Sequence, residues 1–288
     1  MGVLIPSHRR LILLPLLLAA VACGDLSPVA ESTGSRRIVS LAPSITETVF
    51  ALGLGDRVVG VDDYSTWPAE TASLPSLGGL FDPNLEAIAA LEPDLAIVLP
   101  SQSDLGERLV ELGIDVLEVP SDTLDDVEGA ATAIAERCGV AEAGRKLVDR
   151  LHRELAPAPL RAPPTTALVV GRRPGQLATV LVAAPGTYFD ELLTRLGAVN
   201  VFADAEQPYP QVGLESFVGR RPKALVELQG EPLNPYQRQR LRTDWLAAPG
   251  IDLADACVTV IDGYEVLTPG PRLAEVYRRL RTALEACA

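Results

Sequence analysis

The stretch NLEAIAALEPDLAIV at residues 84–98 decides the fold, because GLESFVGRRPKALVE at residues 213–227 repeats its pattern. In both copies a Glu, Glu86 or Glu215, stands seven residues before a Pro. Apolar residues at helical spacing lead to that Pro, which ends a helix and biases the residue before it toward extended geometry. A β-type apolar run then follows, AIVL in the first copy and ALVEL in the second. Each copy therefore predicts a helix that leads into a buried strand.

The recurrence of this helix–Pro–strand step about 130 residues later indicates two similar lobes built from βα units. Any α/β protein contains such steps, but the step itself does not require the matched Glu. A second pair of segments repeats in the same chain order, with matching spacing of a Glu, two apolar residues and a Gly (Glu47, Val49, Leu52 and Gly53; Glu191, Leu193, Leu196 and Gly197). This second match strengthens the inference of a duplication.

Strand and helix signals alternate through residues 36–138 and again through residues 161–288, which predicts one lobe in each range. The first helix of the first lobe has Ser44 and Glu47 in an S-x-x-E pattern, which predicts a capping box. We therefore expect each lobe to be an α/β structure.

Residues 139–160 are predicted to contain a single long helix that joins the lobes. Within them Leu147, Leu151 and Leu155 recur every four residues and no β-type run occurs. An ordinary surface helix of one larger domain is the alternative. The predicted fold is thus α/β, with two similar lobes joined by a linking helix.

Residues 1–22 have the arrangement of a secretory signal peptide, with His8, Arg9 and Arg10 before an apolar run and small residues after it. The apolar length is too short to span about 30 Å of hydrocarbon. Cys23 follows Ala-Val-Ala and resembles the lipidated Cys of a lipobox. We expect a lipid anchor on Cys23 and a flexible tether over residues 23–35, with ordinary cleavage or a retained anchor as alternatives.

The chain is acidic, with a formal net charge of −13 that becomes −15 once residues 1–22, which hold two Arg and no acid, are removed. Binding to a polyanion needs clustered Lys and Arg, so no nucleic-acid partner is expected. The acidity suits an exported protein, or one that docks on a basic partner.

Three cysteines, Cys138, Cys257 and Cys287, remain beyond Cys23. Export permits one disulfide, but the sequence alone does not choose it, although Cys257 and Cys287 lie in the same predicted lobe. Buried free thiols are the default expectation. A metal cluster is not expected, because no second Cys or His stands near any of them at ligand spacing.

Most enzymatic chemistry is missing from the chain. The two His residues are His8, in the signal segment, and His152, on the predicted linking helix, so neither a Ser-His-Asp set nor a multi-His metal site can form. Phosphate-loop, dinucleotide-binding and nucleophile-elbow motifs are absent. Paired-carboxylate hydrolysis remains open, but nothing singles out a pair. We expect no catalytic residues and no cofactor.

Six of the 13 aromatic residues fall on or beside predicted loops between elements (Tyr64, Trp67, Phe81, Tyr188, Tyr209 and Tyr264). Loops that leave the ends of parallel strands are where open α/β sheets bind ligands. Aromatic faces with polar tips suit a large, partly apolar ligand. Loop packing explains any one of them, but the whole set, divided between both lobes, favours a binding cleft.

Five segments resemble the substrate-binding proteins of ABC importers for cobalamin, haem and iron siderophores. They are RIVSLAPSITETVFALG, VGVDDYSTWP, PNLEAIAALEPDLAIV, YPQVGLESFVGRRPKALVEL and the loop from Asp262 to Arg272, and the resemblance covers residues 36–285. It implies two Rossmann-like lobes joined by one long helix, a ligand cleft between the lobes as in class III periplasmic binding proteins, and a small closure. It also implies a monomeric, periplasmic or otherwise extracytoplasmic protein.

The resemblance implies that Glu86 and Glu215 dock against Arg residues of an ABC permease, through which the ATPase is coupled. YSTWP and YPQV look most like the cobalamin binders, in which the positions of Tyr64 and Tyr209 touch the corrin. Part of their aromatic cage is missing here, at residues 78–81 and at Leu99. The ligand-binding residues that we expect are Tyr64, Trp67, Phe81, Tyr209, Asp262, Tyr264 and Arg272.

Two related ligands remain as rivals to cobalamin. Siderophore anions need Arg, for which Arg172, Arg173 or Arg272 are available. Haem needs an axial ligand from Tyr64, Tyr209 or Tyr264. The sequence thus predicts an extracytoplasmic lipoprotein that captures a corrinoid or an iron chelate and delivers it to an ABC permease without covalent chemistry. An exported two-lobed enzyme and a sensory lipoprotein are the alternatives from other classes.

Overall fold

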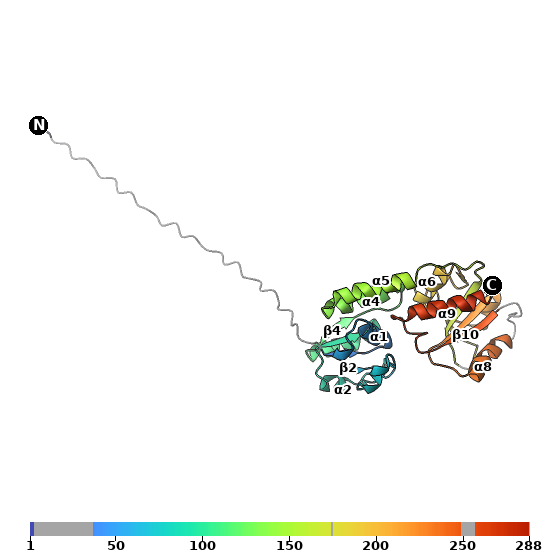
Figure 1. Cartoon of the computed structure of the whole chain (residues 1–288), viewed down its shortest axis with the longest axis horizontal. Helices are drawn as coiled ribbons and strands as arrows, with labels where there is room; N and C mark the ends of the chain where they lie inside the picture. Colours follow the sequence, from blue (N-terminus) through green and yellow to red (C-terminus); the bar gives the residue numbers. More distant parts are fainter. Residues whose placement is uncertain (3–36, 174, 249–256, 288) are drawn as a thin grey trace. The chain divides into compact units, whose positions relative to one another are not determined.

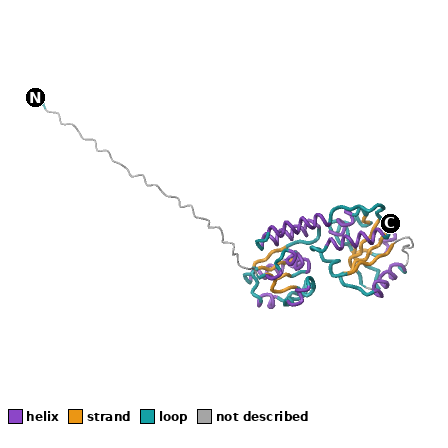
Figure 2. The backbone as a smooth tube through the Cα atoms, in the orientation of Figure 1, coloured by secondary structure: helices purple, strands orange, loops and turns teal. Residues whose placement is uncertain are grey.

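Two β-sheets with helices beside them make up the folded protein in the computed structural model (Figures 1 and 2). The structure describes residues 1–2, 37–173, 175–248 and 257–287. The predicted signal peptide beyond its first two residues, Cys23 and the tether therefore lie outside the described residues. In the described part of the chain, no helix is both long and apolar enough to cross a membrane.

The first sheet is parallel throughout and has the strand order β2-β1-β3-β4. Its strands are β1 (Ile38–Ser40), β2 (Val58–Val61), β3 (Leu95–Val98) and β4 (Asp115–Glu118). The α-helices of this lobe are α1 (Pro43–Ala51), α2 (Leu85–Ala90), α3 (Ser103–Glu111) and α4 (Leu124–Arg137). The central strands β1 and β3 are fully buried, as expected of a parallel sheet with both faces covered. This lobe has the predicted α/β construction.

The second sheet is mixed and has the strand order β10-β9-β5-β6-β8, with β7 paired to β5. Its strands are β5 (Thr165–Gly171), β6 (Val180–Val182), β7 (Val199–Asn200), β8 (Gln211–Val212), β9 (Ala224–Gln229) and β10 (Cys257–Asp262). The helices of this lobe are α6 (Tyr188–Arg195), α7 (Leu214–Arg220), α8 (Pro235–Leu246) and α9 (Leu273–Glu285). The sequence did not predict that β6 runs antiparallel to β5. Too few residues separate these strands for the crossover of about a dozen that a parallel neighbour needs.

The duplicated element forms the same helix–strand step in both lobes. Helices α2 and α7 begin at the matched Leu85 and Leu214, and strands β3 and β9 follow at matched positions. Each helix is followed by a residue with positive φ directly before the Pro, Glu92 at 46° and Arg221 at 45°. The expectation of extended geometry before the Pro was therefore wrong. A left-handed residue closes the helix and also avoids the right-handed region that a following Pro disfavours.

Helix α5 (Ala141–Glu154) connects the two lobes in the chain and packs beside α4 (Figure 1). Its predicted apolar face is confirmed, since Leu147, Leu151 and the adjoining Leu155 are buried in a hydrophobic core cluster that contains residues of both lobes. Gly144 allows the close approach, because a Cβ at this position would lie 2.5 Å from the Cβ of Ala135 on α4. The linking helix is thus an integral part of the core.

The predicted capping box at Ser44 and Glu47 is wrong. Helix α1 starts at Pro43 after the N-cap Ala42, and no side chain caps it. Because Pro43 supplies the first helical residue, Ser44 lies inside the helix rather than before it. Glu47 is buried and faces away from its own N-cap, toward Arg272 of the second lobe.

Two cysteines of the second lobe form a disulfide, so the default expectation of free thiols was wrong for them. Cys257 at the start of β10 is bonded to Cys287 just beyond the end of α9, with their Cα atoms 5.3 Å apart. The bond ties the edge strand of the sheet to the last helix. Cys138 is buried in the core cluster at the end of α4.

Candidate ligand-binding site

A cavity of about 310 Å³ lies between loops of the two lobes. Its walls come from the loops after β2, β9 and β10, which are the carboxyl ends of parallel strands, together with the first helix. The lining residues are Pro43, Glu47, Asp63, Tyr64, Thr66, Trp67, Gly230, Glu231, Tyr264, Leu267, Thr268 and Arg272. Its volume is in the usual range for small-molecule sites, whose lower end is roughly 300 Å³.

Asp62 stabilises the loop that contains Tyr64 and Trp67. Its carboxylate accepts the backbone N–H of Tyr64 at 3.0 Å and the hydroxyl of Ser65. The Ser65 hydroxyl continues to Thr46 on α1 at 2.7 Å. Burial raises the pKa of Asp62, although these hydrogen bonds oppose the shift. These contacts hold the loop backbone, while the residues Tyr64 and Trp67 remain 64% and 50% exposed.

The opposite wall is the loop after β10. Tyr264 is 49% exposed, and its carbonyl accepts the hydroxyl of Thr268 at 2.8 Å, which closes the loop on itself. Leu267 adds an exposed apolar side chain to the same wall. The cavity therefore has aromatic surface on both lobes.

Arg272 joins the two walls. Its Nε donates to Oε2 of Glu47 at 2.9 Å, a second nitrogen also donates to Glu47, and Glu265 lies 3.6 Å away. The guanidinium carbon stands 5.1 Å from the ring centroid of Trp67, at the distance of a cation–π contact. Burial raises the pKa of Glu47 above its ordinary value of 4.5, and Arg272 opposes that shift. The positive charge of Arg272 is thus already paired with carboxylates of the protein itself.

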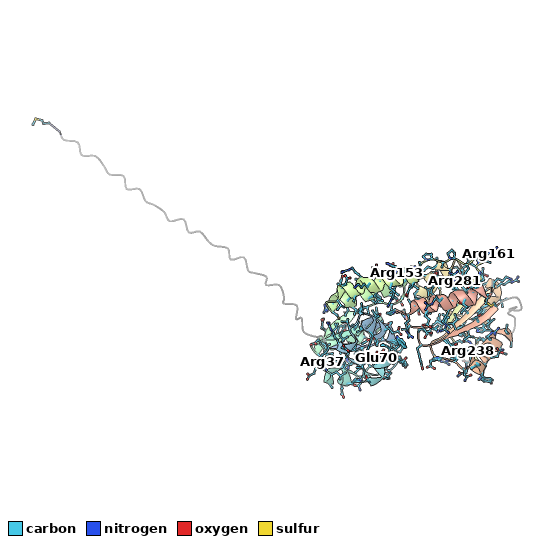
Figure 3. All side chains as sticks on the ribbon, viewed as in Figure 1. Arg37, Glu70, Arg153, Arg161, Arg238 and Arg281 are labelled. Carbon is cyan, nitrogen blue, oxygen red and sulfur yellow. A yellow bond between two sulfur atoms is a disulfide. The ribbon has the colours of Figure 1, made fainter. Side chains whose placement is uncertain are left out.

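A second hollow of about 530 Å³ shares Glu47, Trp67 and Arg272 with the first cavity. Its other lining residues come from α1, α5, α9 and the loop before Glu70, which is labelled in Figure 3. They include both acids and bases, among them Glu70, Glu154, Arg150 and Arg278. The Trp67–Arg272 pair therefore separates an aromatic cavity from a mixed-charge one.

Four of the seven predicted ligand-binding residues, Tyr64, Trp67, Tyr264 and Arg272, line the aromatic cavity. Phe81 is 86% exposed and lines a different hollow of about 320 Å³ with Asp104 and Arg108. Tyr209 is half-buried against the core cluster, and burial together with the charge of Asp122 raises its pKa.

Asp262 and Arg172 serve the protein itself rather than the cavity. The Asp262 carboxylate accepts the N–H of Leu233 at 2.7 Å and Nε of Arg238 at 2.6 Å (Arg238 is labelled in Figure 3). The Arg172 side chain is fully buried, with Nε 2.9 Å from Glu227 and one terminal nitrogen 3.1 Å from Asp244. The sequence analysis offered Arg172 as a partner for a siderophore anion. The structure shows that Arg172 is not available for this role.

The sequence missed several lining residues, chiefly Glu47, Asp63 and Glu231. Asp63 and Glu231 each stand two residues after the last residue of β2 and β9, so the rule that ligands bind where parallel strands end would have found them. Glu47 gave no such signal, because its pattern indicated a helix cap.

The predicted docking residues occupy matched places. Glu86 and Glu215 are both exposed and both lie in the first turn of their helices, α2 and α7. Neither lines the aromatic cavity. Both carboxylates are therefore at the protein surface.

Comparison with known proteins identifies the family. Residues 38–243 match the family described as periplasmic binding protein, and the chain belongs to this family. It is 30% identical over 266 residues to the vitamin B12-binding protein of Vibrio cholerae serotype O1. The matched region covers 84% of this chain and 95% of the relative.

Solved structures of the same kind are similar over most of the chain. The periplasmic vitamin B12-binding protein of Vibrio cholerae superimposes with a TM-score of 0.68 at 26% identity, covering 88% of this chain and 97% of the other. The periplasmic haem-binding protein of Roseiflexus sp. RS-1 gives 0.72 at 26% identity, with 88% and 99% covered.

The family and the fold together establish the class of protein. The chain is a binding protein with the two-lobed fold of class III periplasmic binding proteins, and it is not an enzyme. In the ranges that the structure describes, no three His, Cys, Asp or Glu side chains are grouped so as to hold a metal ion.

Proposed function

We propose that this chain captures a corrinoid, cobalamin, outside the cytoplasm and delivers it to an ABC permease. The observation that carries the proposal is the charge of the aromatic cavity. Among its described lining residues Arg272 is the one base, and Glu47 and Glu265 already neutralise it, whereas Glu47, Asp63 and Glu231 are acids. A ligand with carboxamide groups around a large ring fits such a site better than an anion. The relative from Vibrio cholerae named for vitamin B12 supports the same ligand.

Haem is the second candidate, and a specific observation favours it. Tyr64 and Tyr264 both line the cavity, and a Tyr oxygen can serve as an axial ligand to haem iron. The similar structure from Roseiflexus is a haem-binding protein. Against haem stands the lack, among the described residues that line the cavity, of an uncommitted cation for two propionates. The same lack weighs more heavily against anionic siderophores.

Delivery is assigned to Glu86 and Glu215. One exposed carboxylate on each lobe would contact Arg residues of the permease and fix the orientation of the docked protein, with the ATPase coupled through the permease. The protein would act as a monomer, since the two lobes already provide both docking points.

The N-terminal segment and the disulfide support an extracytoplasmic location. We propose a signal peptide at residues 1–22, a lipidated Cys23 with a tether to residue 35, lobes at 36–138 and 161–288, and a linking segment at 139–160. The Cys257–Cys287 disulfide supports export, because such bonds persist in oxidising compartments.

Titration of the purified protein with cyanocobalamin, haem and ferric siderophores tests the ligand. Of the two Trp residues, Trp67 is half exposed at the cavity and Trp245 is fully buried, so Trp67 should report binding by fluorescence. We expect saturable quenching by cyanocobalamin at one equivalent and no turnover of the ligand. The Trp67→Phe variant controls for quenching that does not come from the cavity. Saturable binding of haem with no response to cobalamin would instead establish the second candidate.

A further inference from the structure

The mirrored glutamates Glu47 and Glu191 each reach from their own lobe to the other. Glu47 on α1 accepts from Arg272, the N-cap residue of α9 in the second lobe. Glu191 on α6 accepts the backbone N–H of Leu124, the first residue of α4 in the first lobe, at 2.9 Å. Helices α1 and α6 thus match in sequence, and their glutamates also make corresponding contacts with the other lobe.

The two helices that receive these contacts are equivalent as well. Helix α4 follows the edge strand β4 of the first sheet, and α9 follows the edge strand β10 of the second. In each lobe the first helix therefore contacts the start of the opposite lobe's last sheet-associated helix. The arrangement is reciprocal, which a chance surface contact between two domains would not be.

Backbone contacts accompany each glutamate. The N–H of Tyr188, the first residue of α6, donates to the carbonyl of Asp122 at 2.7 Å. On the other side, Gly270 lies against α1, where an added Cβ would be 3.5 Å from the Ser44 carbonyl and 3.6 Å from Oε2 of Glu47. The loops before α4 and α9 also meet, since Pro120 and Pro269 line one small hollow. The two crossings therefore form one continuous contact region.

The crossing contacts satisfy polar groups that have no partner within their own lobe's helix. The N–H groups of a helix's first turn lack intrahelical acceptors. Thr123 caps the N–H of Asp126, but the N–H of Leu124 is satisfied by Glu191 of the other lobe. The buried Glu47 carboxylate likewise depends on Arg272. Rotation of one lobe against the other would leave these groups unpaired, and that is costly.

We propose that Glu47 and Glu191 are a matched pair of positioning residues that hold the two lobes in one mutual orientation. The cavity walls belong to different lobes, with Tyr64 on one and Tyr264 on the other, so this orientation sets their separation. The inference concerns the protein without ligand. Its test therefore stands whichever ligand the cavity takes.

Hydrogen–deuterium exchange of the purified protein, resolved to single amides, tests the pair. In Glu191→Ala the Leu124 amide should exchange roughly tenfold faster or more, because it loses a hydrogen bond to a charged acceptor. Glu191→Gln should retain most of the protection, since the amide oxygen still accepts. These two variants measure the direct contact.

The decisive variant is Glu47→Gln, which touches neither Leu124 nor Tyr188. If the pair holds the lobes together, exchange at both amides should rise, because loosening one crossing loosens the other. Asp204→Asn is the matched control: it removes an exposed carboxylate that pairs with Arg220 inside the second lobe, and exchange at these amides should stay unchanged.

Two results would overturn the proposal. One is unchanged exchange of the Leu124 amide in Glu191→Ala. The other is a Glu47→Gln variant in which exchange rises only around residues 268–273, which would make Glu47 a local support of α9. Far-UV circular dichroism checks that each variant is folded. If Glu47→Gln does not fold, the less deeply buried Glu191 still tests the coupling, through increased exchange around residues 268–273 in Glu191→Ala.

Discussion

Glu47 illustrates how a buried ion pair can matter without adding stability. Its side chain is 3% exposed and its partner Arg272 is 20% exposed, so ionisation of the carboxyl carries a desolvation cost. A pair of this kind fixes geometry, because movement of either partner would leave the charge of the other buried and unpaired. The value of the Glu47–Arg272 pair therefore lies in the orientation that it enforces.

The pH dependence of stability should reveal this cost. Burial raises the pKa of Glu47 above 4.5, so between pH 4.5 and the raised pKa the folded protein keeps a proton that the unfolded chain releases. The stability that Glu47 contributes is fully present below pH 4.5 and is lost as the pH rises through the raised pKa. In urea unfolding at about pH 4 to 7, the free energy of unfolding of the wild type minus that of Glu47→Gln should fall with rising pH.

Glu142→Gln provides a control of opposite sign. A hydrogen bond from Arg145 lowers the pKa of the exposed Glu142, so its contribution is present above pH 4.5 and lost as the pH falls through the folded-state pKa. A difference for Glu47→Gln that stayed constant with pH would contradict the assigned shift.

Most of the predicted residues that line the cavity are those whose type and the end of a strand coincided. Tyr64, Trp67 and Tyr264 satisfied both conditions and line the cavity. Arg172 satisfied them too, yet it is buried because Glu227 on the neighbouring strand β9 neutralises it. That pairing depends on which strands are adjacent, which one-dimensional patterns do not encode. The same reason kept the partner of Glu47 hidden.

At the scale of elements, the α4–α5 contact shows that close packing can outweigh helix propensity. Gly144→Ala should destabilise the protein by about 1–3 kcal/mol, because the new Cβ would overlap that of Ala135. Gly129→Ala on α4 is the matched control. A Cβ there meets nothing within 4 Å, so the variant should gain about 0.5–1 kcal/mol from propensity alone. Chemical denaturation measures both, and a stabilised Gly144→Ala would refute the packing argument.

The disulfide belongs to the same scale, because it joins the start of β10 to the end of α9. The Cys257→Ser, Cys287→Ser double variant should lower the free energy of unfolding by about 2–4 kcal/mol. Urea unfolding of the oxidised wild type and the variant measures the loss. The wild type under reducing conditions should match the variant, and equal stability of all three would contradict a structural role.

Elements were predicted better than their connections. Periodicity and Pro positions gave the helix–strand steps, including the matched α2 and α7, because these signals are local. The antiparallel β6 and the disulfide were not foreseen, since both depend on which segments become neighbours in space. The termination of α2 and α7 by left-handed residues was missed because neither Glu92 nor Arg221 is a Gly.

At the scale of the molecule, the proposed docking points should be separable from ligand capture. Glu86→Ala combined with Glu215→Ala should abolish cobalamin uptake in cells while leaving the affinity of the purified protein unchanged, because both carboxylates are exposed and away from the cavity. Glu107→Ala combined with Glu285→Ala removes two other exposed carboxylates, one from each lobe, and should leave uptake intact. Loss of ligand affinity in the first double variant would instead assign these residues to the ligand site.

The reciprocal crossing of α1 onto α9 and of α6 onto α4 has a consequence for the origin of the chain. A single lobe that made this contact with a second copy of itself would form an isologous dimer, with one patch used twice about a two-fold axis. Fusion through α5 then converts the dimer interface into a contact within one polypeptide, and each half is left free to diverge. Two separately expressed halves, divided after α5, should therefore recover the folded protein only when they are mixed.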